Sequence, residues 1–205
     1  VVCLGIWVDP HLASRHGVFF SPRHNASELS FMLQKPSRDK IEELTSQFLF
    51  MMDIGVWLLS DKAVDVLMRK CGWDGVSFKN KVPQFYDLYS TFGTCLGTTP
   101  SDVDADIADL TVAIVPLHNG EFYHYGTSLE LITSTEKIQN RILDQRAILH
   151  HHIKPHPSLF VQNADANINW TSDQHHIWIE NSYVPSSWQL AHQHVITGVP
   201  ANDWA

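Results

Sequence analysis

The sequence has no long hydrophobic run. No stretch of about 18 apolar residues occurs in the 205 residues, and no basic segment precedes an apolar one. The sequence therefore predicts neither a membrane-spanning helix nor a signal peptide. Hydrophobic residues make up 44% and charged residues 18% of the chain, a balance that is typical of a globular protein with one large or two small domains. We expect a cytoplasmic protein.

Cysteine and positive charge are also scarce. The three cysteines, Cys3, Cys71 and Cys95, are far apart and odd in number, which favours free thiols in a reducing compartment over a disulfide framework. The net charge is −8, from 14 Lys and Arg against 22 Asp and Glu. This balance argues against a nucleic-acid surface, because neutralising a phosphate backbone requires a basic stripe. A phosphorylated ligand would instead need a few local cations.

Strand-like and helix-like segments alternate through the first two thirds of the chain. The first apolar run begins at Val1 without an initiator Met, so we expect a piece of a longer polypeptide. Ser37 and Ser60 stand where they can cap two helices. The pattern predicts an α/β sheet with helices on its faces. The expected strands are 1–8, 18–20, 30–33, 48–59 and 110–117, and the expected helices are 37–44, 60–72 and 84–92.

Two of the strand-like runs contain a charge. Lys35 ends the run from Phe31, and Asp53 interrupts the run from Phe48. Fully burying an unpaired ammonium or carboxylate costs several kcal/mol, so each charge should face a cleft or a partner. The structural alternative is that Lys35 ends an edge strand and Asp53 meets a nearby arginine.

A second stretch predicts an anion site. Residues 122–125 have the pattern of a strand, Gly126 permits a sharp bend, and Thr127 can open a helix. Free N–H groups at a helix N-terminus favour a bound anion. Alternation along the strand would place His124 alone on one face, between Tyr123 and Tyr125.

Two other clusters suggest metals but lack the full pattern. Aspartates occur at 102, 104, 106 and 109, yet Ile107 and Ala113 stand where a calcium loop requires Gly and Glu. A solvated start of a helix is the better interpretation. Histidines 150–152 with His156 lack cysteine or carboxylate partners at zinc-ligand spacing, so a solvated or core cluster is favoured.

The C-terminal part has a different period. Thr133 and Glu136 have capping-box spacing for a connecting helix. Beyond it, apolar residues recur every six positions, which is typical of the stacked coils of a parallel β-helix. An irregular β-domain is the alternative. We predict one domain over 1–140 and a connector with a β-helix over 141–205. The recurring residues are Trp178, Val184, Leu190 and Ile196.

Three strings, FMLQKPS, FYHYGTS and IWIENSYV, resemble the fucose-1-phosphate guanylyltransferase branch of the nucleoside-diphosphate-sugar pyrophosphorylases. Bacterial members of that branch are fused to an L-fucokinase. In the superfamily a Glu-Lys-Pro motif supplies a lysine for the sugar phosphate, and here Gln34 replaces the Glu. The resemblance implies the second half of a Rossmann-like nucleotidyltransferase domain with a mixed sheet, followed by a short left-handed parallel β-helix.

The resemblance also implies a reaction, in which L-fucose-1-phosphate and GTP give GDP-L-fucose and pyrophosphate. It makes Lys35 and His124 the catalytic candidates and Mg²⁺ the expected cofactor, with no metal ligand assigned. His124 replaces the Asp of the superfamily's Asp-x-Gly-Thr motif, and Mg²⁺ prefers oxygen ligands. The residues implied for substrate binding are Gln34, Lys35, Asp53, Gly55, Gly126 and Thr127.

The superfamily's glycine-rich nucleotide loop is missing from the chain. We therefore expect a fragment that is inactive alone and that packs against the missing half, with a sugar-kinase domain in the same polypeptide. The expected partners are the sugar-1-phosphate and GTP, without nucleic acid or membrane. The alternatives are a pyrophosphorylase for another sugar-1-phosphate and a non-catalytic β-helix module for assembly or binding. Convergence of Lys35, Asp53 and His124 in one cleft would favour the enzyme.

Overall fold

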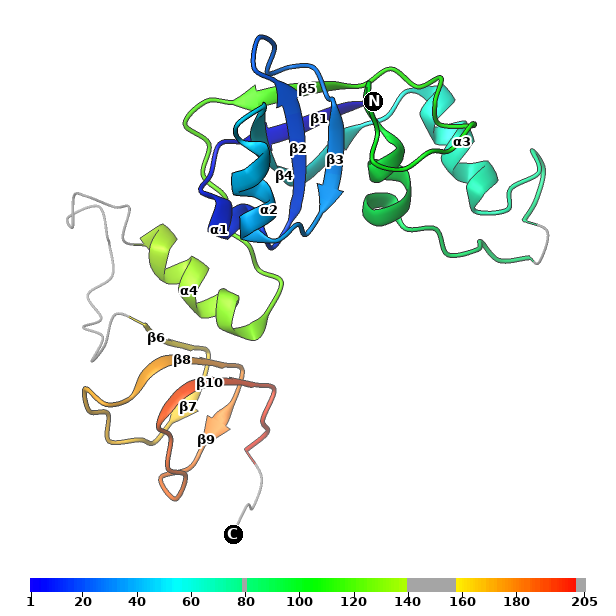
Figure 1. The fold of residues 1–205 in the computed structure, drawn as a ribbon. Helices are drawn as coiled ribbons and strands as arrows, with labels where there is room; N and C mark the ends of the chain where they lie inside the picture. The colour runs from blue at the N-terminus through cyan, green and yellow to red at the C-terminus, as the bar shows by residue number, and fades with distance from the viewer. Residues whose placement is uncertain (79–80, 140–157, 202–205) are drawn as a thin grey trace. The chain divides into compact units, whose positions relative to one another are not determined.

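The computed structural model describes residues 1–78, 81–139 and 158–201 (Figure 1). The contacts divide the chain into two compact units, Val1–Phe122 and Tyr123–Ala205, and each is described by itself. The boundary predicted at Asn140 lies outside the described residues. Helix α4 (Ser128–Gln139), which precedes it, belongs to the second unit.

The first unit contains a five-stranded mixed sheet with the order β3-β2-β4-β1-β5. Only β1 and β5 run parallel; the other neighbouring pairs are antiparallel. The predicted hairpin of β2 and β3 is confirmed, and the long strand from Phe48 is the centre of the sheet. The strands are β1 (Val2–Ile6), β2 (Gly17–Pro22), β3 (Phe31–Gln34), β4 (Phe48–Leu58) and β5 (Ala113–Leu117).

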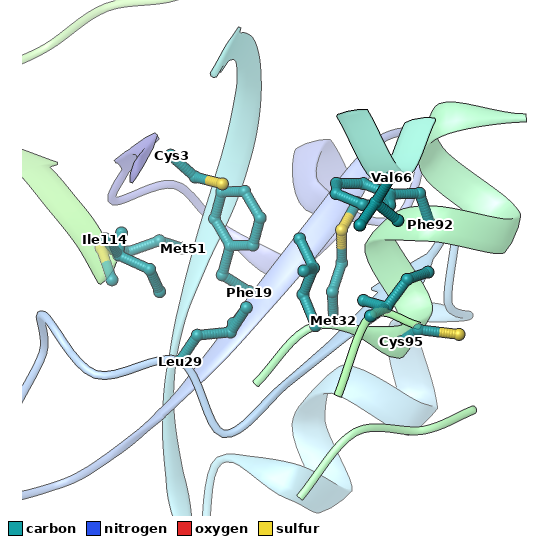
Figure 2. Close-up of a cluster of buried hydrophobic side chains, with 11 residues drawn as sticks. Cys3, Phe19, Leu29, Met32, Met51, Val66, Phe92, Cys95 and Ile114 are labelled. Atoms are coloured by element: carbon teal, nitrogen blue, oxygen red, sulfur yellow. The ribbon is translucent and has the colours of Figure 1, made fainter. Parts of the chain in front are cut away.

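Alternation along the strands gives the sheet two apolar faces. On β4, Met51 and Met52 are both fully buried but belong to different clusters. Met51 packs in the cluster that Figure 2 shows, where the Met32 side chain extends toward Phe92. Asp53 follows with the same orientation as Met51, because side chains two residues apart share a face. The carboxyl group therefore lies on the face covered by residues 88–96.

Short helices with side-chain caps flank this sheet. The Ser37 side chain accepts a hydrogen bond from Lys40 N at the start of α2 (Arg38–Leu44), and Ser60 does the same for Ala63 N at α3 (Asp61–Lys70). Both caps confirm the sequence prediction. A further short helix, α1 (Pro10–Ala13), precedes β2 and is capped by Asp9.

Two predicted segments differ from the structure. The helix expected at 84–92 is reduced to the π-helical turn η1 (Leu88–Phe92) and the 3₁₀ turn η2 (Gly93–Cys95), while Phe85 is 91% exposed. Four apolar residues at helical spacing did not suffice, since the predicted apolar face is not buried as a whole: Phe85 and Tyr89 are exposed, while Leu88 and Phe92 pack on the core. The aspartates at 102–109 lie in turns and start no helix. Lys70 binds Asp104 and Asp106, each at 2.7 Å.

The second unit consists of α4 and parallel strands. Strand β8 (His175–Glu180) lies between β6 (Leu159–Gln162) and β10 (His192–Thr197), and both pair with it in parallel. Two shorter strands, β7 (Asp165–Ala166) and β9 (Tyr183–Val184), also pair in parallel. The helix predicted to begin at Thr133 is wrong, because α4 runs through this position without interruption.

The six-residue period identified the interior of this unit only in part. Val184, Leu190 and Ile196 pack in one apolar cluster with Ile177 and Ile179. Trp178 was predicted to belong to the same series, but it packs with α4 and β6 instead. The reason is strand alternation, since Trp178 lies between two residues that point to the opposite face. His150–His152 and His156 lie outside the described residues.

In the described part of the chain, no helix is long and apolar enough to cross a membrane.

Candidate functional site

Three strands bring Gln34, Gly17 and Asp53 side by side, an arrangement that we call the polar row. Gly17 pairs with Gln34 across β2 and β3. A Cβ placed on Gly17 would lie 3.1 Å from Gln34 Oε1 and 3.3 Å from Asp53 Cβ. It would also meet Met32 Cε at 2.5 Å. The missing side chain at Gly17 thus lets two polar residues, far apart in sequence, meet on one face of the sheet.

Asp53 is a buried carboxylate with only 5% of its surface exposed. Its Oδ1 accepts hydrogen bonds from Gly55 N at 2.8 Å and from Trp57 Nε1 at 3.0 Å. Burial raises the pKa of Asp53, and the two hydrogen bonds act in the opposite direction. No hydrogen bond from a described residue reaches Oδ2. The sequence alternative that an arginine pairs with Asp53 is therefore wrong.

The polar row has neighbours on β1, beyond the central strand. Gly5 of β1 pairs with Asp53, so glycines flank the carboxylate on both neighbouring strands. Cys3 lies on the same face, and burial, followed by the Asp53 charge, raises the pKa of its thiol to about 12. A thiol with this pKa stays protonated at neutral pH and is a poor nucleophile.

Gln34 and Lys35 form the outer end of the row. Gln34 Oε1 is buried without a hydrogen-bond partner among the described residues. Lys35 follows directly and is exposed, with a backbone φ of 47° that is uncommon outside glycine. Its N–H donates to His16 O at 3.0 Å, which holds this turn. β3 is an edge strand, as the structural alternative supposed, but the left-handed backbone at a lysine is a strained conformation of the kind that clusters at functional sites.

An aromatic pair stands beside the carboxylate. Trp57 donates to Asp53, and its ring meets the Tyr89 ring edge to face with centroids 5.7 Å apart. Gly55, with φ of 76°, is exposed. The only described atom within 4 Å of a Cβ placed on Gly55 would be Tyr89 Oη, at 3.5 Å. The surface at Gly55 is therefore open and bordered by the tyrosine hydroxyl.

At the predicted anion site, a side chain of α4 itself contacts the loop that precedes the helix. Glu130 Oε2 accepts from Gly126 N at 3.0 Å and from Thr127 Oγ1 at 3.2 Å, and it lies 3.0 Å from His124 Nδ1. Thr127 Oγ1 in turn accepts from Glu130 N at 3.2 Å. Thr127 and Glu130 thus cap the helix reciprocally, in the manner of a capping box, except that Glu130 accepts from the N–H of the residue before the cap.

The electrostatics at α4 fit this arrangement. Burial alone would raise the pKa of Glu130, but the hydrogen bonds from His124 and Thr127 prevail and lower it. The strand predicted over 122–125 is wrong, because these residues form no ladder. Phe122 packs in the first unit, and His124 contacts α4 in the second. Ser134 Oγ, for example, donates to His124 O at 2.6 Å.

The structure thus brings together Gln34, Asp53 and Gly55 near Lys35 in the first unit, whereas His124, Gly126 and Thr127 form a separate group in the second unit. Glu130 and Tyr89 were not predicted from the sequence as site residues. The spacing of Thr127 and Glu130 is itself a capping-box signal. No local signal could place Tyr89 beside Gly55, because that contact is long-range.

Among the described residues, no group of three or more His, Cys, Asp or Glu side chains is placed to hold a metal ion. Glu130, a carboxylate beside His124, already has three partners. The described residues therefore do not by themselves make a site for Mg²⁺, which favours several oxygen ligands.

Comparison with known proteins agrees with the sequence strings. No protein-family model matches the chain. All 205 residues align at 51% identity with an L-fucokinase/L-fucose-1-P guanylyltransferase from Bacteroides fragilis. The chain is homologous to part of that protein. It spans 21% of the relative's length.

A solved structure shares the fold. The crystal structure of mannose-1-phosphate geranyltransferase from Thermus thermophilus matches 98% of this chain and 54% of its own, with a TM-score of 0.51. The two sequences are 15% identical, so the match bears on the fold and not on the ligand. It agrees with the mixed α/β architecture predicted from sequence.

Proposed function

We propose that this chain forms the sugar-phosphate side of a guanylyltransferase domain, whose full-length protein converts L-fucose-1-phosphate and GTP into GDP-L-fucose and pyrophosphate. The observation that carries the proposal is the 51% identity over the whole chain to the Bacteroides fragilis protein. The polar row supports it, because it gathers hydrogen-bonding groups suited to a sugar.

The reaction requires that the two anionic substrates are positioned and that their charge is neutralised. An oxygen of the sugar phosphate attacks the α-phosphorus of GTP, a new P–O bond forms, and the bond to the β-phosphate oxygen breaks to release pyrophosphate. The attacking phosphate is ionised at pH 7, so no protein nucleophile or strong base is needed. The chain's contribution would be to hold one anion in line for attack.

Lys35 is the proposed cation for the sugar phosphate. Its ammonium is not in any ion pair between described residues, and its side chain is exposed at the end of the polar row. The strained turn at Lys35 fixes the point where the side chain leaves the sheet. A charge-assisted hydrogen bond to phosphate contributes about 1.5–3 kcal/mol.

Gln34, Asp53 and Gly55 are the proposed sugar contacts. The unpartnered Gln34 Oε1 can accept from a hydroxyl group, and Asp53 Oδ2 is open to the same bond. A 6-deoxy sugar would also need an apolar surface, for which Met51, Met52 and Trp57 are the apolar residues near Asp53 in sequence. Both methionines are fully buried, so only Trp57 is placed for that role.

Magnesium and the phosphate roles of His124, Gly126 and Thr127 stay predictions. The described residues do not fit a Mg²⁺ site, and no step is assigned to the ion. Phosphate binding at α4 would require Glu130 to leave its present partners.

We further propose that β6 to β10 belong to a short left-handed parallel β-helix. Support comes from the parallel registers, in which Leu159 pairs with Ile177 and His194 pairs with the same residue. Successive strands are thus stacked with apolar residues between them. Such coils bury apolar surface only when stacked, so the longer polypeptide, with a kinase domain, would be the natural context.

The test is pyrophosphate release by the full-length protein with GTP and a panel of sugar-1-phosphates. We expect turnover with L-fucose-1-phosphate, and at least tenfold less with the others. Preference for another sugar would favour the alternative pyrophosphorylase. Absence of turnover with every sugar would favour the non-catalytic binding module and contradict the proposal.

A further inference from the structure

The turn that carries Tyr89, next to Gly55, is held in place at both of its ends. The Asp87 side chain accepts from Tyr89 N at 2.8 Å and from Ser90 N at 2.7 Å, which caps the π-helical turn η1. Phe92, at the other end of this turn, is fully buried. Single-turn π-helices occur frequently at functional sites. The turn is therefore anchored at both ends, and the position of Tyr89 is fixed by it.

Tyr89 differs from the buried residues of this turn. It is 38% exposed, and it rests against the Trp57 ring on one side. Burial raises the pKa of its hydroxyl, and the Asp53 charge adds to the effect. The hydroxyl thus keeps its proton at neutral pH and remains a hydrogen-bond donor. It stands over the open surface at Gly55.

We propose that Tyr89 is a substrate-contacting residue that helps to determine sugar specificity, with its hydroxyl bonded to a sugar hydroxyl above Gly55 and its ring packed on the sugar. The proposal deepens the proposed function and rests on it. Asp53 accepts and Tyr89 donates, so the two sides of the opening suit a hydroxyl group that both donates and accepts. Tyr89 lies outside the strings that carry the family resemblance.

Tyr89→Phe in the full-length protein tests this proposal, because it removes one oxygen and leaves the ring. We expect the KM for L-fucose-1-phosphate to rise about fivefold to tenfold, with the KM for GTP within twofold of the parent value. Tyr89→Ala should raise the sugar KM further, since the ring contact is also lost. Tyr86→Phe is the matched control.

Tyr86 is three residues earlier, and its buried hydroxyl has no hydrogen-bond partner among the described residues. The same chemical change there should leave both KM values unchanged. Equal effects of Tyr89→Phe on the sugar and GTP, or a sugar KM within twofold of the parent, would overturn the role of Tyr89. If the parent protein releases pyrophosphate with L-fucose-1-phosphate, either of these results leaves the proposed function intact. If the parent protein shows no sugar-dependent release of pyrophosphate, both the proposed function and the role of Tyr89 are overturned.

Discussion

Asp53 and Glu130 are two carboxylates that each lie beside a glycine, and they differ in what they leave open. Asp53 is 5% exposed and uses one oxygen for two internal hydrogen bonds. The Glu130 side chain is 30% exposed, and a single oxygen meets His124, Gly126 and Thr127. Asp53 is a buried carboxylate whose second oxygen accepts no hydrogen bond from a described residue, whereas Glu130 completes a helix cap.

The pKa directions show the same contrast. Burial raises the pKa of Asp53, whereas the hydrogen bonds at Glu130 outweigh burial and lower its pKa. A charge that opposes folding is retained where it serves a ligand, because functional sites often sacrifice stability. A charge that supports folding needs no other reason to be present. The difference agrees with the sugar contact that we propose for Asp53, whose Oδ2 has no hydrogen-bond partner among the described residues.

Replacing Asp53 should have the largest effect. Asp53→Ala leaves the Gly55 and Trp57 N–H groups without their acceptor, which should lower the free energy of unfolding by about 1–3 kcal/mol. We expect the kcat/KM for L-fucose-1-phosphate to fall about 100-fold in the full-length protein. Urea unfolding and pyrophosphate release measure the two effects. Asp53→Asn is the control for folding, since its amide oxygen can still accept both bonds.

Lys35→Met should have the next largest effect. Loss of a charge-assisted phosphate contact should lower the kcat/KM for L-fucose-1-phosphate at least tenfold and change GTP binding much less. Lys40→Met is a matched control, because Lys40 is exposed on α2 and pairs only at the surface with Glu43 at 3.0 Å. Turnover within twofold of the parent would show that Lys35 is not the phosphate lysine.

Glu130→Gln should affect stability more than activity. The weakened cap should lower the free energy of unfolding by about 1 kcal/mol, while sugar use stays within twofold of the parent. His124→Leu should behave in the same way, because its ring lies against the same carboxylate. A tenfold loss of activity in His124→Leu, not restored by added Mg²⁺, would instead support the phosphate contact predicted from sequence.

The smallest expected effect is the opposite pH dependence of the two sites. The stabilisation associated with the raised pKa of Asp53 is complete below its ordinary value of 3.8 and is lost as pH rises through the folded value. The contribution of Glu130 is present above its ordinary value of 4.5 and is lost as pH falls through the lowered value. Solvent screening at the partly exposed Glu130 keeps its contribution to the free energy of unfolding small.

Urea unfolding from about pH 3 to about pH 6 measures these contributions against the parent. With rising pH, Asp53→Asn should gain stability relative to the parent, and Glu130→Gln should lose it. The same trend in both variants would contradict the comparison between the two carboxylates.

Local signals predicted much of the first unit. Ser37 and Ser60 mark their helices because a cap depends on neighbours only, and the hairpin of β2 and β3 follows from adjacent apolar runs. The helix at 84–92 failed because its apolar spacing carries no information on what it packs against. The strand expected around His124 failed for a similar reason, since no partner strand is available there among the described residues and α4 satisfies its backbone.

The candidate site was predictable in its residues but not in its geometry. Lys35 and Asp53 were selected because charged groups are costly in buried strands, and Gln34 because the family resemblance implies a sugar contact there. The approach of Gln34 and Asp53 at Gly17 depends on the register of three strands, which no single segment specifies. Tyr89 was missed altogether for this reason.

Calorimetric titration of the full-length protein with L-fucose-1-phosphate tests the central claim most directly, with Asp53→Asn and Glu130→Gln compared in one experiment. If the polar row binds the sugar, Asp53→Asn should still fold but should bind L-fucose-1-phosphate at least tenfold more weakly than the parent. The affinity of Glu130→Gln should stay within twofold of the parent value. Unchanged affinity in Asp53→Asn, with binding lost in Glu130→Gln, would contradict the account and move the ligand to the helix N-terminus.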